Sequence, residues 1–128
     1  MNPSKVTDLK AFLPAKDLAV SKQFYLELGF REVWDSGDAC ELELEGQRFI
    51  LTGVYVKEHA ENCMMSLNVE DADLWWEHIT RLGLQDKYQL VMARPPTLQP
   101  WGLRVLYLSD PSGVLWHIAD RQLCTPFP

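Results

Sequence analysis

The 128-residue sequence lacks several features that define common classes of protein. No apolar run approaches the roughly 20 residues that a bilayer span needs, and residues 1–16 lack the apolar core of a signal peptide. Basic residues are few: 12 lysines and arginines against 18 aspartates and glutamates give a net charge of −6. Such a balance argues against binding to a phosphate backbone. We therefore expect no membrane partner and no nucleic acid partner.

Cysteine and the patterns of common catalytic sites are also scarce. The three cysteines (Cys40, Cys63 and Cys124) are an odd number and include no C-x-x-C pair. This predicts reduced thiols and a cytoplasmic protein. No glycine-rich phosphate loop is present, and no cysteine has an evident general base in the sequence. These patterns therefore point neither to nucleotide chemistry nor to a cysteine nucleophile.

The residues that are present suit one compact domain over residues 1–128. Apolar residues make up 47% of the chain and aromatic residues 11%, which excludes disorder and allows a real core. The clearest pattern lies in residues 101–120, where two runs of alternating apolar and polar residues flank Asp110-Pro111-Ser112-Gly113. Alternation with a period of two indicates strands, and proline followed by glycine closes a tight turn. A β-hairpin is therefore predicted here.

The chain before this hairpin reads as further strands and two helices. Asp17 can cap the start of a helix that ends at Gly29, and Asp71 and Gly83 bracket a second helix in the same way. The expected strands are residues 9–15, 30–34, 39–45, 47–52, 63–69 and 88–92, with a linker at residues 53–62 and a proline-rich loop at residues 93–100.

The two halves of the chain share this spacing. Cap and stop are twelve residues apart in both helices, and an offset of 54 superimposes strand, cap, helix and stop. This predicts a duplicated β-α-β-β-β module, the first at about residues 8–53 and the second at about 63–120, with a linker at 54–62. The predicted fold class is α+β, in which the two modules form a curved mixed sheet around a concave cleft, with helices on the outside.

Alternation also assigns side chains to the two faces of the strands. If the helices cover one face, they should meet the more apolar set: Leu42, Leu44, Phe49, Leu51, Leu103, Val105, Tyr107, Val114, Trp116 and Ile118. Side chains of opposite parity then line the concave side: Lys10, Phe12, Trp34, Glu41, Glu43, Arg48, Ile50, Met64, Ser66, Asn68, Arg104, Leu106, Leu108, Leu115 and His117.

The concave set contains charges of both signs and a tryptophan, and each has two interpretations. Glu41, Glu43 and Glu45 can form a solvated edge strand. The neighbouring strand places Arg48 on the same face, so a cleft lined by carboxylates and a guanidinium is an equal alternative. Trp34 can stack on a planar or cationic ligand, or it can pack in the core or in a dimer interface.

The sequence resembles the vicinal oxygen chelate superfamily in two stretches, LPAKDLAVSKQFYLELGF at residues 13–30 and YLSDPSGVLWHIAD at residues 107–120. That superfamily includes glyoxalase I, extradiol dioxygenases, fosfomycin-resistance enzymes and bleomycin-resistance proteins. With the paired modules, the resemblance covers residues 8–120. Its motifs are specific for the superfamily and weak evidence for any one activity, because one fold hosts many chemistries.

Metal-dependent members of the superfamily place four ligands on the concave face, and the resemblance carries those positions onto Lys10, Ile50, Met64 and His117. Only His117 offers a donor that a divalent ion in oxygen chemistry prefers. The resemblance therefore implies no metal, no cofactor and no catalytic residue. A metal site built from His117 and a nearby glutamate, or metal-free acid–base catalysis by such a pair, is the alternative.

The resemblance is greatest to the metal-free bleomycin-resistance proteins, which are acidic and share the L-P-x-x-D character of residues 13–17. It implies a homodimer, in some relatives with exchanged modules, that sequesters a bulky cationic or aromatic compound in a cleft at the dimer interface. A glyoxalase- or dioxygenase-like metal enzyme around His117 and an interaction domain without a ligand are the alternatives. The predicted ligand-binding residues are Lys10, Phe12, Trp34, Glu41, Glu43, Arg48, Met64, Ser66, Trp101, Arg104 and His117.

Overall fold

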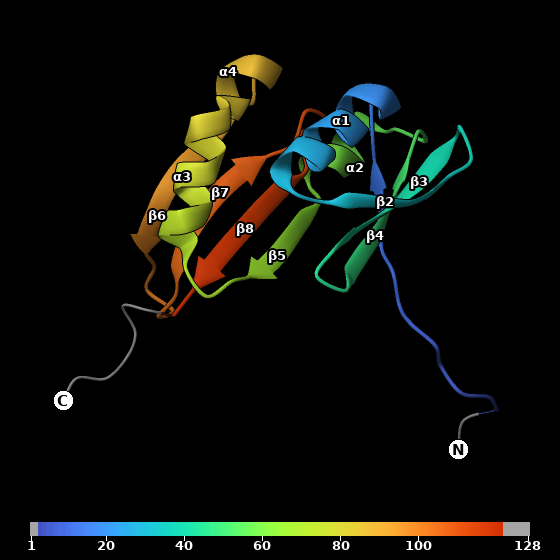
Figure 1. Ribbon diagram of the computed structural model, residues 1–128, viewed down its shortest axis with the longest axis horizontal. Helices are drawn as coiled ribbons and strands as arrows, with labels where there is room; N and C mark the ends of the chain where they lie inside the picture. Colours follow the sequence, from blue (N-terminus) through green and yellow to red (C-terminus); the bar gives the residue numbers. More distant parts are fainter. Residues whose placement is uncertain (1–2, 122–128) are drawn as a thin grey trace.

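The computed structural model describes residues 3–121 and contains two four-stranded mixed sheets (Figure 1). The first sheet has the order β1-β4-β3-β2 and the second β5-β8-β7-β6, with β1 parallel to β4 and β5 parallel to β8. The two halves repeat one arrangement, which confirms the predicted α+β class and the duplicated module. The strands are β1 (Phe12–Pro14), β2 (Arg31–Asp35), β3 (Ala39–Leu44), β4 (Gln47–Thr52), β5 (Met64–Asn68), β6 (Ala93–Leu98), β7 (Arg104–Ser109) and β8 (Leu115–Asp120). The helices are α1 (Leu18–Leu28), α2 (Lys57–Glu61), α3 (Ala72–Leu82) and α4 (Leu84–Tyr88).

The two long helices, α1 and α3, begin and end where the sequence predicts. The Asp17 carboxylate accepts a hydrogen bond from the Val20 amide at the start of α1, and the Asp71 carboxylate caps α3 in the same way. Gly29 (φ +134°) and Gly83 (φ +62°) follow the helices in backbone conformations that disfavour other side chains. Local capping chemistry therefore sets both helix boundaries.

One core joins the helix-covered faces of the two sheets. The ring centroid of Phe49 in β4 lies 5.7 Å from that of Trp116 in β8, although these strands belong to different sheets. The Tyr25 ring from α1 packs against both, with its centroid 5.0 Å from that of Phe49 and 5.8 Å from that of Trp116. Aromatic pairs of this kind bury large apolar areas, so α1 and β8 hold the two halves together.

A buried hydrogen-bond network reinforces this contact. The Tyr25 hydroxyl donates to the Asp110 carboxylate at 2.6 Å and accepts from the Trp116 indole N–H at 2.9 Å. Asp110 begins the predicted turn of the β7–β8 hairpin, and its other oxygen accepts the amides of Ser112 and Val114. The turn that closes the hairpin is thus also the point where it is fastened to α1.

The prediction for the residues that follow α3 is wrong in two places. Residues 88–92, predicted as a strand, contain the end of α4, and the last strand of the second sheet is β6, which was predicted as a loop. Pro95 and Pro96 are tolerated because β6 is an edge strand and its pairing with β7 shifts between Arg94 and Thr97. Proline marks an edge here rather than a loop.

The predicted linker at residues 53–62 is also more ordered than expected. It contains the short helix α2, whose Ala60 is buried, and α2 contacts β1. Within residues 3–121, no helix is long and apolar enough to cross a membrane.

The face prediction is confirmed for β3, β4 and β8 and wrong for β7. The register pairs Leu106 with Ile118 and Tyr107 with His117. Leu106 and Leu108 therefore point to the helix-covered face, where both are 0% exposed, and Tyr107 points the other way. Both parities of β7 are apolar, so alternation could not distinguish them.

Candidate functional site

The open face of the first sheet, the face opposite to the helices, carries the side chains that the sequence predicts for it. In the strand register Glu41 lies opposite Ile50, Glu43 opposite Arg48, and Trp34 opposite Glu41. Phe12 in β1 is level with Ile50. The open face of the first sheet consists of Lys10, Phe12, Trp34, Glu41, Glu43, Arg48 and Ile50.

Glu41 lies at the centre of this face and is only 2% exposed. Its Oε1 accepts hydrogen bonds from the Lys10 ammonium at 2.9 Å and from the Trp34 indole N–H at 2.7 Å, and its Oε2 accepts one from Arg48 at 3.3 Å. These donors, the Lys10 ammonium foremost, lower the pKa of Glu41, and the same bond raises the pKa of Lys10. Glu41 is therefore an ionised carboxylate whose partners are already within the protein.

The remaining charge on this face is also paired. Arg31 donates to the Glu43 carboxylate, and Arg48 Nη2 lies 3.8 Å from Glu43 Oε1. Asp8 lies 3.3 Å from the Lys10 ammonium. The cluster holds three cations and three carboxylates, namely Lys10, Arg31, Arg48, Asp8, Glu41 and Glu43. It therefore has no net charge, although the whole chain is acidic.

The open face of the first sheet offers a ligand exposed aromatic side chains. Trp34 is 39% exposed and Phe12 is 60% exposed. The hydrogen bond from the Trp34 indole to Glu41 fixes the ring through its N–H edge. A held indole can stack on a planar ligand without a large loss of side-chain entropy.

The open face of the second sheet is formed by a different group of residues. The strand register places Met64 beside Leu115 in β8, and both Ser66 and Tyr107 beside His117. The Tyr107 and His117 ring centroids are 4.8 Å apart with the planes at 70°. Sequence reasoning missed Tyr107 because it placed β7 in the wrong orientation, although hairpin pairing with His117 was the signal that could have found it.

His117 carries an unusual polar atom. Its Nε2 is buried, and no residue in the described part of the chain makes a hydrogen bond to it. Buried polar atoms are nearly always bonded, so a partner for this nitrogen is expected from outside residues 3–121 of one chain. No hydrogen bond or ion pair between described residues links His117 to the charged cluster around Glu41.

The predicted orientation of Arg104 is wrong. Arg104 lies on the helix-covered face of β7, where Nε and Nη2 donate to both carboxylate oxygens of Asp120 at 2.9 and 2.6 Å, and Nη1 donates to Asp73 at 3.0 Å. Asp120 also accepts the amide of Ala72 at the start of α3. The pKa of Arg104 is raised, chiefly by Asp120. This cluster ties α3 to the end of β8 and does not face the predicted cleft.

Trp101 lies in the turn between β6 and β7 and is 60% exposed. In the described residues it makes no side-chain hydrogen bond and no ring contact with the open faces. Its part in ligand binding stays a prediction. The free thiols of Cys40 and Cys63 have pKa values raised by burial, which makes them weak nucleophiles; Cys124 lies outside the described residues.

The four positions that the resemblance assigns to metal ligands do not fit a metal ion. The Lys10 ammonium is bonded to Glu41, the Ile50 side chain has no lone pair, and Met64 offers an exposed thioether. His117 alone has a suitable donor. Among residues 3–121, no three His, Cys, Asp or Glu side chains lie close enough together to hold a metal. The side chains at these four positions therefore give no basis for a metal-assisted step.

Comparison with known proteins assigns the family. A sequence profile described as the glyoxalase/bleomycin resistance protein/dioxygenase superfamily matches residues 9–118. The chain belongs to this superfamily. A comparison with curated proteins found no match.

Solved structures of the superfamily share the fold. A bleomycin-binding protein complexed with bleomycin has a TM-score of 0.76 at 21% identity, covering 91% of this chain and 100% of that one. A bleomycin resistance determinant encoded on the transposon Tn5 has a TM-score of 0.75 at 23% identity, covering 91% and 99%. A lactoylglutathione lyase from Agrobacterium tumefaciens has a TM-score of 0.66 at 16% identity, covering 93% and 97%. At these identities the similarity shows the fold, which binding proteins and a lyase both use.

Proposed function

We propose that this protein is a metal-free binding protein that sequesters a bulky aromatic or cationic small molecule, as the bleomycin-binding relatives bind bleomycin. One observation carries the proposal: the Lys10 ammonium, at a position where metal-dependent relatives have a ligand, is bonded to Glu41 at 2.9 Å. A protonated amine has no lone pair for a metal. The proposed site therefore binds its molecule without a metal ligand at this position.

The proposed ligand stacks on aromatic surface. Trp34 in β2 is half-exposed and held by Glu41, and Phe12 is exposed on β1 at the opposite edge of the same face, so a bulky ligand would span the face to contact both. Because the charged cluster around Glu41 is neutral, attraction to a cation comes from the Trp34 ring face more than from a free carboxylate. This favours a planar, delocalised cation or a neutral aromatic compound over a small compact ion.

The proposed binding cleft lies between two copies of the chain. Each open face alone is a half-site: one offers Trp34, Phe12 and the neutral charge cluster, and the other offers His117 beside Ser66. A homodimer that brings the open face of the first sheet of one copy against the second sheet of its partner completes an enclosed pocket. We place this dimer in the cytoplasm, where its thiols stay reduced.

A thermal-shift and calorimetric screen tests the proposal. Bleomycin, proflavine and 2-naphthoate sample a glycopeptide, a planar cation and an aromatic acid. A true ligand at a hundred times its Kd should stabilise the native protein by about 2.7 kcal/mol. Trp34→Ala should weaken binding about tenfold or more, because stacking and cation–π contacts are lost. Trp76→Phe, on α3 and away from the open faces of both sheets, is the matched control and should bind as the unaltered protein does.

Two results would reject the proposal. One is that no compound in the screen raises the melting temperature. The other is that a compound binds equally well to the Trp34→Ala protein, which would place the ligand away from the open face of the first sheet.

A glyoxalase- or dioxygenase-like metal enzyme is the second candidate function. The unpartnered, buried Nε2 of His117 favours it, because a metal ion is one way to satisfy such an atom. The purified protein would then contain close to one equivalent of a divalent metal, lost in His117→Ala. Metal-free protein that still binds an aromatic ligand supports the sequestering function instead.

A further inference from the structure

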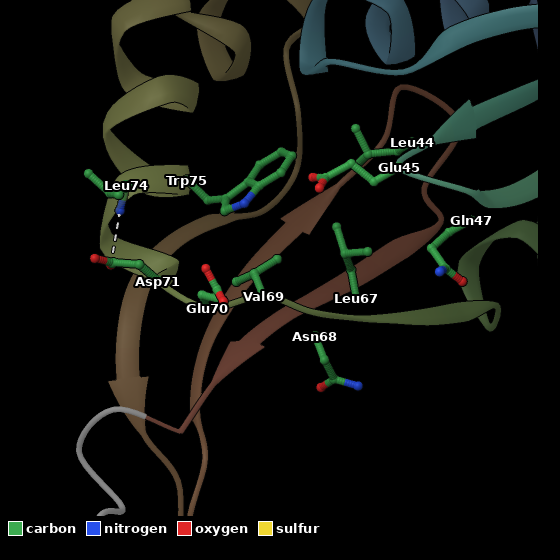
Figure 2. Close-up of a pocket in the computed structure, with 10 residues that line it drawn as sticks. All are labelled: Leu44, Glu45, Gln47, Leu67, Asn68, Val69, Glu70, Asp71, Leu74 and Trp75. Carbon is green, nitrogen blue, oxygen red and sulfur yellow. Dashed lines mark hydrogen bonds between the residues drawn. The ribbon is translucent and has the colours of Figure 1, made fainter.

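A groove of about 560 Å³ lies between the two halves of the chain, on the side of the helices (Figure 2). The turn between β3 and β4 forms one wall, and the segment from the end of β5 to the first turn of α3 forms the other. Its volume is in the range of small-molecule sites. Leu44 and Leu67, which line it, belong to helix-covered faces, so this groove is distinct from the open faces of the proposed function.

The walls of the groove are apolar in their middle. Leu44 and Leu67 contribute apolar side chains, and Trp75 is half-buried on α3. Figure 2 shows the Trp75 indole reaching from α3 toward Leu44 and Glu45 on the opposite wall. A molecule between these walls would contact leucine side chains and one face of an indole, which favours an apolar or aromatic body.

The polar groups around this apolar strip are acidic. Three carboxylates line the groove, those of Glu45, Glu70 and Asp71, and none of its ten lining residues is a lysine, arginine or histidine. Asp71 Oδ1 is occupied by the amides of Asp73 and Leu74. The Glu45 carboxylate has no hydrogen bond or ion pair with any residue between 3 and 121. The groove therefore presents negative charge beside an aromatic ring.

We propose that this groove is a second binding site, which takes a small organic cation with an aromatic or aliphatic body. The ammonium lies near Glu45, and the body lies against the Trp75 ring, between α3 and the side chains of Leu44 and Leu67. Carboxylate and indole together attract a cation by charge and by cation–π contact, while the apolar strip selects against a bare metal ion. This proposal stands independently of the aromatic ligand on the open face.

Three related probes isolate the contribution of charge, and the first two are matched in size. Phenethylamine, 2-phenylethanol and 3-phenylpropionate share a phenyl ring and a short chain but carry positive, zero and negative charge. Calorimetry should show the amine binding about tenfold tighter than the alcohol, and the acid weakest. In an NMR titration the amine should shift the indole N–H signal of Trp75 and leave that of Trp34 unmoved. Equal affinity for all three probes, or a shift at Trp34 instead, overturns the proposal.

Paired variants locate the cation. Glu45→Gln removes one charge at an exposed turn and should weaken phenethylamine about threefold, whereas Glu58→Gln removes the same charge from the remote helix α2 and should change nothing. Trp75→Leu keeps an apolar side chain and should cost about tenfold. Unchanged affinity in Glu45→Gln rejects the site even if Trp75→Leu fails to fold. Trp34→Ala should bind phenethylamine normally, so failure of the open-face proposal and failure of this one are distinguishable.

Discussion

The ammonium of Lys10 and the carboxylate of Glu41 lie 2.9 Å apart across the open face of the first sheet, although 31 residues separate them in the chain. Lys10 precedes β1, whereas Glu41 is in the middle of β3, with β4 between the two strands. The pair thus spans three strands of the sheet. We expect both the stability of this sheet and the properties of the proposed site to depend on it.

Lys10→Met should make the protein more sensitive to acid. A carboxylate with a lowered pKa stabilises the folded state above its ordinary value, here 4.5, and loses that contribution as pH falls through the lowered value. Lys10 is the largest cause of the lowering, so its removal raises the pKa of Glu41. Acid unfolding followed by tryptophan fluorescence should therefore begin at higher pH in Lys10→Met than in the control Lys5→Met. Superimposable acid transitions would contradict this interpretation of the pair.

Arg104→Ala should destabilise the protein by about 3 kcal/mol or more, because it leaves the Asp120 carboxylate buried without its bidentate partner. Urea unfolding measures the loss, and Arg94→Ala on the exposed edge strand β6 is the control, expected within about 0.5 kcal/mol of the unaltered protein. Arg104 does not face the proposed cleft, so ligand affinity at 20 °C should not change. A loss of ligand affinity with unchanged stability would instead indicate that Arg104 contacts the ligand.

The wrong prediction for the orientation of Arg104 illustrates which parts of the structure can be predicted from the sequence. Asp17 with Gly29, and Asp71 with Gly83, predicted both long helices because capping is local chemistry. The polar–apolar alternation of β3 and β4 predicted their faces. In β7 both parities are apolar, so only the pairing with β8, a tertiary contact, orients the strand.

The site was predictable in the same uneven way. The strand register confirms the placement of Glu41, Glu43, Arg48 and Trp34 on one face. The neutrality of their cluster was not predictable, because Arg31 and Asp8 join it through contacts that alternation does not report. The groove between Glu45 and Trp75 could likewise not be predicted from the sequence, because its walls come from two halves that meet only in the folded chain.

Tyr25→Phe should cost about 1–3 kcal/mol although it removes a single oxygen. The lost hydroxyl leaves the buried Asp110 carboxylate without one donor and the Trp116 indole N–H without its acceptor. Urea unfolding of Tyr25→Phe against Tyr55→Phe, whose hydroxyl has no hydrogen bond with the described residues, isolates this contribution. Equal stability of the two variants would show that the network contributes nothing beyond packing.

The exposed apolar side chains of the edge strands predict a homodimer. Phe12 on β1 and Met64 on β5 are 60% and 63% exposed, and both strands are at the edges of their sheets. Uncovered edges with large apolar side chains favour association, and a twofold dimer covers both at once. Light scattering at micromolar concentration should give twice the 14.8 kDa mass of the chain. The double variant Phe12→Glu/Met64→Glu should be monomeric and should lose the open-face ligand, whereas Leu98→Glu, 53% exposed on β6 at the opposite edge of the second sheet from β5, should remain dimeric. If the unaltered protein has the mass of a single chain, the predicted dimer is wrong. The enclosed cleft on which the proposed sequestering function depends would then be wrong as well.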